Sequence, residues 1–287
     1  MAMTAVGSSI VIRDIETTAE FKAIEEFQRE IWRIPDIDVV PLYHLVASVA
    51  SGGILLGAYD RNEIVGFVYG FVGFERGRTV HHSHMLAVHP EYRSQDLGFR
   101  LKAAQRERVL SQGISIMTWT FDPLQSLNAN FNIRKLGAVA DRYYIDFYGS
   151  DAASFLHSTG TDRLWVSWML RNERVISRIE KSLAIDDRQP PRPLVDSASG
   201  DVPILNDLSG LAAEDAVSIK IPRSVNSIAE RDRGLAMEWR FATRDAFVAA
   251  FDAGFAVSDF VIPGASDNAP GGYILRRDVD LSYWQNS

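Results

Sequence analysis

Residues 82–98 have the sequence HSHMLAVHPEYRSQDLG, in which an apolar strand-like segment is followed by a short polar loop and the start of a helix. The sequence predicts a strand over 79–88 and a helix over 97–112, which a glycine ends. A helix that begins directly after a tight loop presents unpaired N–H groups and the positive end of its dipole to an anion. The stretch therefore predicts an anion site over residues 93–98, with a geometry that suits a pyrophosphate.

The sequence before this stretch predicts two helices and a β-hairpin. Thr17 or Thr18 is a suitable N-cap for the first helix, and Pro41 is a suitable first-turn residue for the second. Two apolar runs then flank a polar turn, which is typical of a hairpin. The predicted elements are a strand at 9–15, a helix at 17–32, a helix at 41–52, and strands at 54–59 and 64–73.

The sequence after this stretch is less regular. The segment 114–121 is apolar or β-branched on both faces, as in a buried strand. The polar, proline-rich segment 186–201 predicts a linker or an exposed excursion. The other predicted elements are a helix from Pro123 to Lys135, strands at 138–148 and 162–168, a helix at 227–252 and a strand at 255–262.

This order of elements predicts an α/β fold, specifically an α+β mixed sheet flanked by helices. We expect a catalytic domain at 1–170 and a C-terminal α/β extension at 171–287. That extension is expected to add to the first sheet or to cap it, and in either arrangement it is a candidate to complete an acceptor site.

The composition limits the possible functions. The 287 residues carry a net charge of -7 and include no cysteine, which excludes disulfides, thiolate zinc sites and thiol nucleophiles. No basic stripe is visible, since the basic residues of 100–108 are spaced like a solvated helix face, so we expect no nucleic-acid partner. No signal peptide or membrane-spanning segment is evident, so we expect a cytoplasmic protein without a membrane partner.

The segment LAVHPEYRSQDLG resembles the coenzyme-A-binding signature of the GNAT acyltransferases, whose loop runs Arg/Gln-x-x-Gly-x-Gly/Ala. Arg93 takes the first position of that loop and Gly98 the last. The later segment NANFNIRKLGA is similar to the second helix of the family, with its ending at Lys135 and Gly137. The resemblance covers about residues 10–150. It implies a GNAT-like fold and an acyl-CoA-dependent N-acyltransferase, with acetyl-CoA or succinyl-CoA as co-substrate and no metal.

The resemblance also implies which residues bind the coenzyme. The pyrophosphate is expected over the loop and the first turn of the helix, and the pantetheine arm along the preceding strand and beside the later helix. The expected cofactor-binding residues are Leu86, Val88, Arg93, Ser94, Gln95, Leu97, Gly98, Phe99, Asn128 and Asn132.

The sequence departs from the family pattern at three positions. Asp96 and Ser94 stand where glycines are common, and a carboxylate facing pyrophosphate would be repulsive. Since Asp is a favoured N-cap, Asp96 is expected to cap the helix and turn outward. Ile133 occupies the position where the family often has a tyrosine that protonates the leaving thiolate, so another residue or solvent must supply that proton.

Four of the six histidines fall between residues 81 and 89. In a regular strand His82, His84, Leu86 and Val88 share one face. The pattern resembles the strand of the arylalkylamine N-acetyltransferases, in which paired histidines relay the proton of the amine. Because an amine with a pKa near ~10 must lose a proton before it attacks, His82 and His84 are the expected bases. Structural histidines and a His-x-His metal site are the alternatives.

Asp122 ends the strand 114–121 and is the third catalytic candidate, expected to orient a histidine or to hold the acceptor amine. An Asp-Pro pair that only terminates the strand is equally consistent with the pattern. Arg142, Arg163 and Arg240 are either partners for a carboxylate of a substrate or partners in surface ion pairs.

The expected function is direct transfer of an acetyl or succinyl group to a small primary amine or an amino acid. TWTFDPLQSLNANFNIRKLGA followed by TDRLWVSW resembles a bacterial subgroup of GNAT-like proteins with long C-terminal extensions, and this resemblance suggests the succinyl donor and amino-acid acceptor. The alternatives are a non-catalytic acyl-CoA-binding sensor and a scaffold with a partner-binding module. A homodimer is possible.

Overall fold

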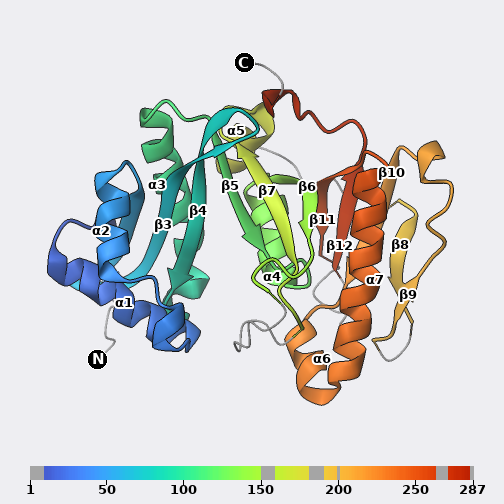
Figure 1. Ribbon diagram of the computed structural model, residues 1–287, viewed down its shortest axis with the longest axis horizontal. Helices are drawn as coiled ribbons and strands as arrows, with labels where there is room; N and C mark the ends of the chain where they lie inside the picture. The colour runs from blue at the N-terminus through green and yellow to red at the C-terminus, as the bar shows by residue number, and fades with distance from the viewer. Residues whose placement is uncertain (1–9, 150–158, 181–190, 199–200, 263–270, 285–287) are drawn as a thin grey trace, which may run out of the picture. The chain divides into compact units, whose positions relative to one another are not determined.

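The structure is a computed structural model that describes residues 10–149, 159–180, 191–198, 201–262 and 271–284. The chain forms two compact units, Met1–Met117 and Thr118–Ser287. Each unit contains strands and helices (Figure 1). None of the helices in the described ranges is both long and apolar enough to cross a membrane.

The first unit contains an antiparallel sheet in the order β1-β2-β3-β4. Its strands are β1 (Val11–Asp14), β2 (Ile54–Asp60), β3 (Glu63–Glu75) and β4 (Arg78–Val88). Its helices are α1 (Thr18–Trp32), α2 (Leu42–Ala50) and α3 (Leu97–Ser111), with 3-10 turns η1 (Asp36–Asp38) and η2 (Pro90–Gln95). These elements lie where the sequence predicts them.

A capping box fixes the start of α1. The Thr17 hydroxyl accepts from the Glu20 N–H at 3.3 Å, and the Glu20 carboxylate accepts from the Thr17 N–H at 3.0 Å. Two of the otherwise unpaired N–H groups at the start of the helix region are thereby satisfied. The predicted cap at Thr17 is confirmed.

One face of the first sheet is covered by α1 and α2. Their buried side chains, among them Phe21, Ile24 and Leu45, form one apolar cluster with β-strand residues that include Met85 and Ala87. Helix α3 contacts β2, β3 and β4. The alternation of strand side chains places it on the opposite face, because its Leu101 and the Val88 side chain lie against the same side of Gly66.

Strand β4 contains a β-bulge at His84. Tyr69 of β3 pairs with Met85 and Gly70 pairs with Ser83, so His84 has no opposite residue. The extra residue breaks the period-two alternation of side chains. The prediction that His82, His84, Leu86 and Val88 share one face is therefore wrong: the bulge moves the two apolar residues to the face that packs on α3.

The second unit contains strands in the order β5-β7-β6-β11-β12-β10-β8-β9. β5 (Ile116–Phe121) begins at the boundary of the two units, and the neighbours from β7 to β10 are antiparallel, whereas β10 and β8 are parallel. The other strands are β6 (Val139–Tyr144), β7 (Arg163–Met169), β8 (Pro193–Ser197), β9 (Pro203–Leu205), β10 (Ala216–Ile221), β11 (Ala256–Val261) and β12 (Gly271–Arg276).

The helices of the second unit differ from the prediction in two places. The helix expected up to Lys135 is a short α4 (Ser126–Ala129) that continues as a π-helical segment η3 (Asn130–Lys135). The helix expected at 227–252 is divided into α6 (Val225–Arg231) and α7 (Arg233–Asp252), since Asp232 leaves the helical conformation and caps α7. The remaining helices are α5 (Glu173–Ile179) and the 3-10 turns η5 (Leu211–Ala213) and η6 (Ser282–Trp284).

Part of the segment 186–201, predicted to be a linker or an exposed loop, forms a strand. Residues 181–190 and 199–200 lie outside the described residues, but Pro193–Ser197 forms strand β8, in which Leu194 and Val195 are fully buried. Proline is compatible with the first residue of a strand, where it removes no ladder hydrogen bond from the interior. The linker prediction is wrong for this part.

A buried ion pair links two segments of the second unit that lie far apart in the sequence. Arg240 of α7 is fully buried, and its Nη2 donates to the Asp122 carboxylate at 2.7 Å and to the Thr159 hydroxyl at 3.0 Å. Arg244 donates twice to Asp162, at 2.8 Å and 2.9 Å. The interpretation of Arg240 as a surface ion-pair partner is wrong, because its charge is matched inside the core.

Replacing Arg240 tests this pair. Arg240→Leu leaves the Asp122 carboxylate buried without its cation, so we expect the free energy of unfolding to fall by about 3–5 kcal/mol. Arg233→Leu changes an exposed arginine of the same helix and is expected to cost no more than about 0.5 kcal/mol. Urea unfolding measures both, and Asp122→Asn added to Arg240→Leu should restore part of the loss. Equal stability of the two arginine variants would contradict the assignment.

Candidate functional site

Two neighbouring residues, Tyr92 and Arg93, attach the loop between β4 and α3 to the sheet. Arg93 donates from Nε to the carbonyl oxygen of Val88 at 3.1 Å, which folds the loop back onto β4. The Tyr92 hydroxyl donates to the Asp60 carboxylate at 2.8 Å, at the end of β2. The position of the loop relative to the start of α3 is thereby fixed by the fold of the first unit.

Asp96 occupies the N-cap position of α3, but its side chain makes no capping hydrogen bond. Its backbone has the left-handed conformation, with φ of 59°, which glycine adopts without strain and Asp tolerates. The expectation that Asp96 caps the helix through its carboxylate is wrong. The left-handed turn explains why a glycine is common at this position of the family loop.

The predicted coenzyme-binding residues of this loop differ in exposure. Leu97 is fully buried and Phe99 nearly so, so both can meet a ligand only through the backbone. Gln95 and Arg93 are exposed and Gly98 is half-buried. The side chain of Ser94 lies outside the described part of the structure. On β4, Leu86 is half-buried and Val88 is buried.

His82 and His84 lie together in a group of aromatic rings, with ring centroids 6.4 Å apart. The ring of Phe71 lies 5.4 Å from His82 and 5.9 Å from His84, and Tyr69 lies 6.2 Å from His84. The ring of His44, on α2, lies 6.4 Å from Tyr69. The bulge places both His82 and His84 on the α1/α2 side of the sheet.

The surroundings of both rings favour the neutral imidazole. Burial lowers the pKa of His82 to about 4, with smaller contributions from the charges of His84 and Lys102. Desolvation by the surrounding protein also lowers the pKa of His84, and the nearby His44 adds to this shift. A neutral imidazole can accept a proton, so both rings are in the form that a base requires at pH 7.

A buried polar network lies on the opposite face, between β4 and α3. Lys102 donates to the Ser83 hydroxyl at 2.9 Å, and Ser83 donates to the Gln105 side-chain oxygen at 2.8 Å. The amide nitrogen of Gln105 lies 3.2 Å from His81 Nε2. Gly70 makes room for the network, because a Cβ there would stand 2.3 Å from that ring nitrogen.

The sequence does not predict this network, because the basic residues of 100–108 have the spacing of a solvated helix face. Lys102 and Gln105 are buried, at 2% and 0% exposure, although Arg100, Glu107 and Arg108 are exposed. Helical spacing gives a usable signal, since residues 102, 105 and 109 form an i, i+3, i+7 row that ends at a valine. The charge of Lys102 conceals that row.

The remaining candidates belong to the second unit. The Asp122 carboxylate is 8% exposed and accepts from Arg240 and from the Leu124 N–H. Asn128, on α4, is exposed, whereas Asn132, in the π-helical segment, is buried. Ile133 is fully buried and has no ionisable group, so it cannot take the tyrosine's role. Within the described ranges, no three His, Asp or Glu side chains are grouped so that they could hold a metal ion.

Residues 17–137 match the family model described as "Acetyltransferase (GNAT) family". This segment belongs to the GNAT acetyltransferases. It begins at the N-cap of α1, contains the loop and histidine pair described above, and ends at Gly137 after the π-helical segment. The match covers less than half of the chain, and most of the second unit, with its further C-terminal elements, lies beyond it.

The solved structures similar to this chain match little more than half of it. The aminoglycoside 6'-acetyltransferase type Ii is 18% identical, with a TM-score of 0.46, and covers 57% of this chain and 99% of its own. The ribosomal-protein-S18-alanine N-acetyltransferase from Escherichia coli is 12% identical, with a TM-score of 0.46 and coverages of 63% and 99%. An aminoglycoside 6'-N-acetyltransferase complexed with coenzyme A is 16% identical, with a TM-score of 0.44 and coverages of 57% and 98%. No curated protein matches the chain.

The buried His81 predicts a loss of stability in mild acid. Burial lowers its pKa to about 3, below the 6.5 of the unfolded chain. Between these values the unfolded chain binds the proton and the folded chain does not, so stability falls as the pH falls, by ~1.4 kcal/mol per pH unit. His81→Gln should remove this part of the slope between about pH 6.5 and 4.5, measured by urea unfolding. His89→Gln, at a ring outside the network, should retain the wild-type slope; equal slopes in all three proteins would refute the role of His81.

Proposed function

We propose that this acetyltransferase moves an acetyl or succinyl group from coenzyme A to a small primary amine or an amino acid by direct transfer. The observation that carries the proposal is the pair of neutral histidines at the bulge of β4, the strand that leads into the loop and the start of α3. The aminoglycoside acetyltransferases similar to the chain act on small-molecule amines, as their names state. Acyl transfer to such an amine needs a base and an anion site, and the first unit offers both kinds of group.

The anion site is proposed at residues 93–98. Arg93 uses Nε to hold the Val88 carbonyl oxygen, and an arginine has further N–H groups for phosphate oxygens. Asp96 does not cap α3, which leaves the first-turn N–H groups without that side-chain acceptor. These N–H groups and the dipole of α3 favour the pyrophosphate. Gln95 and Ser94 are proposed as further contacts, and Leu97 and Phe99 as backbone contacts.

The base is proposed to be His82 or His84. In the reaction the amine nitrogen forms a bond to the thioester carbon, the carbon–sulfur bond breaks, and the proton of the amine passes to the imidazole, directly or through water. A backbone N–H of 84–88, where the bulge interrupts regular pairing, is proposed to stabilise the developing oxyanion. Leu86 and Val88 are proposed to contact the pantetheine arm through the backbone of the same strand.

Three candidates of the second unit have more limited roles. The pairing of Asp122 with Arg240 supports a positioning role more than direct proton transfer. Asn128 is exposed and is proposed as a hydrogen-bond partner of the pantetheine arm, whereas Asn132 is buried and is proposed to support the π-helical segment beside it. Since Ile133 supplies no proton, we propose that solvent or the protonated histidine protonates the departing thiolate.

A second candidate function is an acyl-CoA sensor that binds without turnover. The specific observation in its favour is the absence of an acid at Ile133, together with the low basicity of His82. Free-thiol release from acetyl-CoA and succinyl-CoA with a panel of amines and amino acids separates the two functions. Turnover supports the acyltransferase; binding of acyl-CoA with no thiol release in any combination supports the sensor.

Two substitutions in the loop test the coenzyme site. Gly98→Glu places a carboxylate and a bulky side chain where the backbone must approach a phosphate, so acyl-CoA binding should be lost. Asp96→Gly removes a negative charge and relieves the left-handed backbone, so affinity should be unchanged or higher. Calorimetry with acetyl-CoA measures both, and circular dichroism confirms the fold. A folded Gly98→Glu protein with wild-type affinity would refute the site.

Substitution of the two histidines tests the base. His82→Ala, His84→Ala and the double variant should lower kcat by about 10²- to 10⁴-fold with little effect on acyl-CoA binding. If the two act as a unit, the double variant should be little worse than the poorer single variant.

The pH dependence gives a separate readout for this pair. Because both pKa values are lowered in the protein without substrate, the ascending limb of kcat/KM that depends on the histidines should lie below about pH 6.5, and for His82 near pH 4. Wild-type rates in both single variants across this range would show that the histidines are structural.

A further inference from the structure

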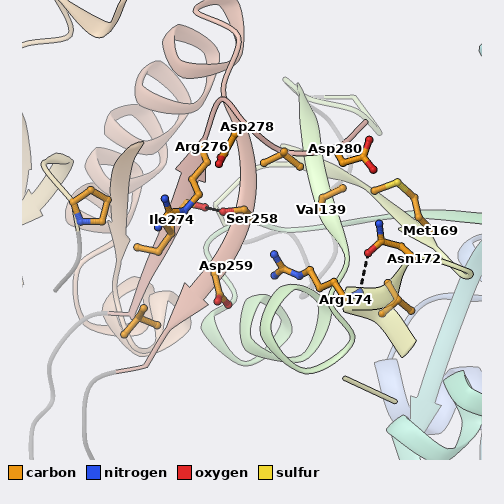
Figure 2. A pocket seen from close by; sticks show the side chains of 15 residues that line it. Val139, Met169, Asn172, Arg174, Ser258, Asp259, Ile274, Arg276, Asp278 and Asp280 are labelled. Carbon is orange, nitrogen blue, oxygen red and sulfur yellow. Dashed lines mark hydrogen bonds between the residues drawn. The ribbon is translucent and has the colours of Figure 1, made fainter. Parts of the chain in front are cut away.

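The second unit encloses a cavity of about 360 Å³ beside α5 (Figure 2). Its walls come from the ends of β6 and β7, from the start of α5, from β11 and β12, and from the segment that follows β12. Apart from Gly137, every lining residue lies outside the family segment 17–137. A volume of this size is within the range of small-molecule sites.

Arg174 extends from α5 into this cavity (Figure 2), and no carboxylate of the described residues forms an ion pair with it. Its Nε and Nη2 are buried and have no hydrogen-bond partner among the residues that the structure describes. These two nitrogens form one edge of the guanidinium, the edge that matches a carboxylate in a bidentate pair. A buried donor without a partner is costly, so this edge marks a place where an acceptor is missing.

The charge of Asp259 acts on both Arg174 and Arg178. The Asp259 carboxylate lies 3.6 Å from Arg178 and also accepts from the Phe260 N–H at 2.8 Å. Burial lowers the pKa of Arg174, the Asp259 charge opposes that shift, and the Arg178 charge reinforces it. One carboxylate thus serves two guanidinium groups, and an additional anion would balance the pair.

Two other arginines of the second unit are paired with carboxylates. Arg244 meets Asp162 through two hydrogen bonds from Nε and Nη2. Arg240 meets Asp122 and Thr159 in the core. Arg244 binds Asp162 through Nε and Nη2, and the same two nitrogens of Arg174 have no partner among the described residues. A carboxylate is therefore the group that fits this edge of Arg174.

Two acids also line the cavity. Asp278 and Asp280 follow β12, and Figure 2 draws them apart from each other and above the guanidinium of Arg174, with Asp278 beside Arg276 and Asp280 toward Asn172. The Ser282 side chain and N–H lower the pKa of Asp280, which keeps it ionised. Arg276 is the cation beside Asp278, so two acids outnumber one base there.

The remaining walls are apolar. They consist of the branched or flexible side chains Val139, Met169, Val175, Val261, Ile274 and Val279. A ligand that fits the cavity therefore carries a carboxylate for Arg174, a cationic group for one of the acids and an apolar group for these walls.

We propose that this cavity is a binding site for a free α-amino acid with an aliphatic side chain. Arg174 binds the carboxylate, Asp278 or Asp280 binds the ammonium group on the same carbon, and the apolar walls hold the side chain. Binding at this site is a property of the second unit and requires neither acyl-CoA nor turnover. Its test therefore stands or fails separately from the proposed acyl transfer.

The test titrates the full-length protein by calorimetry, without coenzyme, using leucine and two analogues of the same shape. Isocaproate keeps the carboxylate and lacks the ammonium group, and isoamylamine keeps the ammonium group and lacks the carboxylate. Leucine should bind with a Kd below about 1 mM, and each analogue should bind about 10- to 100-fold more weakly. No measurable leucine binding would overturn the proposal, as would isocaproate or isoamylamine binding as tightly as leucine.

Variants locate the binding. Arg174→Gln should weaken leucine binding about 10- to 100-fold. Arg174→Lys, which keeps the charge and loses the bidentate edge, should fall between Arg174→Gln and wild type. Arg171→Gln, at an exposed arginine just before α5, is the matched control and should bind like wild type. If Arg174→Gln does not fold, the Lys variant carries the test, and its wild-type affinity for leucine would overturn the assignment.

The acidic side has its own pair of variants. The double variant Asp278→Asn and Asp280→Asn should reduce the affinity for leucine to that for isocaproate. Asp245→Asn, at an exposed acid of α7, should leave leucine binding unchanged. Unchanged leucine binding in the double variant would show that the ammonium group is not held there.

Discussion

The attachment of β4 to α3 is the constraint on which the first unit depends. Lys102, Ser83, Gln105 and His81 form one chain of hydrogen bonds in the core, where an unpaired polar group is costly. This chain holds Ser83 toward α3 on one side of the bulge, and the apolar cluster holds Met85 toward α1 and α2 on the other. His84 is the extra residue between these two fixed points. The placement of the histidine pair is thus a consequence of packing on both faces of the sheet.

Local signals explain why the first unit follows its sequence closely. Each of these signals acts within a few residues, so a local stretch of sequence is enough to predict it. They are the capping box at Thr17, the Gly52-Gly53 end of α2 and the polar turn of the hairpin. The bulge at His84 depends on pairing with Tyr69 and Gly70, which no local pattern reveals. The burial of Lys102 depends likewise on the strand opposite it. The coenzyme loop could be located from its motif, whereas the orientation of its side chains could not.

The second unit is harder to predict because long-range pairing organises it. β8 is short, begins with proline and pairs in parallel with β10, so its sequence resembles a loop until its partner is known. Asp122 and Arg240 are separated by more than a hundred residues, and each alone resembles an ordinary surface charge. The contrast between Arg244, which meets Asp162 inside the protein, and Arg174, which does not, appears only in three dimensions.

The burial of Lys102 has a consequence for an enzyme that handles activated thioesters. Desolvation lowers the pKa of this amine well below its ordinary value, which favours the nucleophilic, uncharged form. While α3 stays on β4, that amine is enclosed at 2% exposure and cannot meet an acyl donor. When the helix opens, water protonates the amine again and its nucleophilicity falls. The protein therefore shields its own core lysine from acylation in both states, by enclosure in the first and by charge in the second.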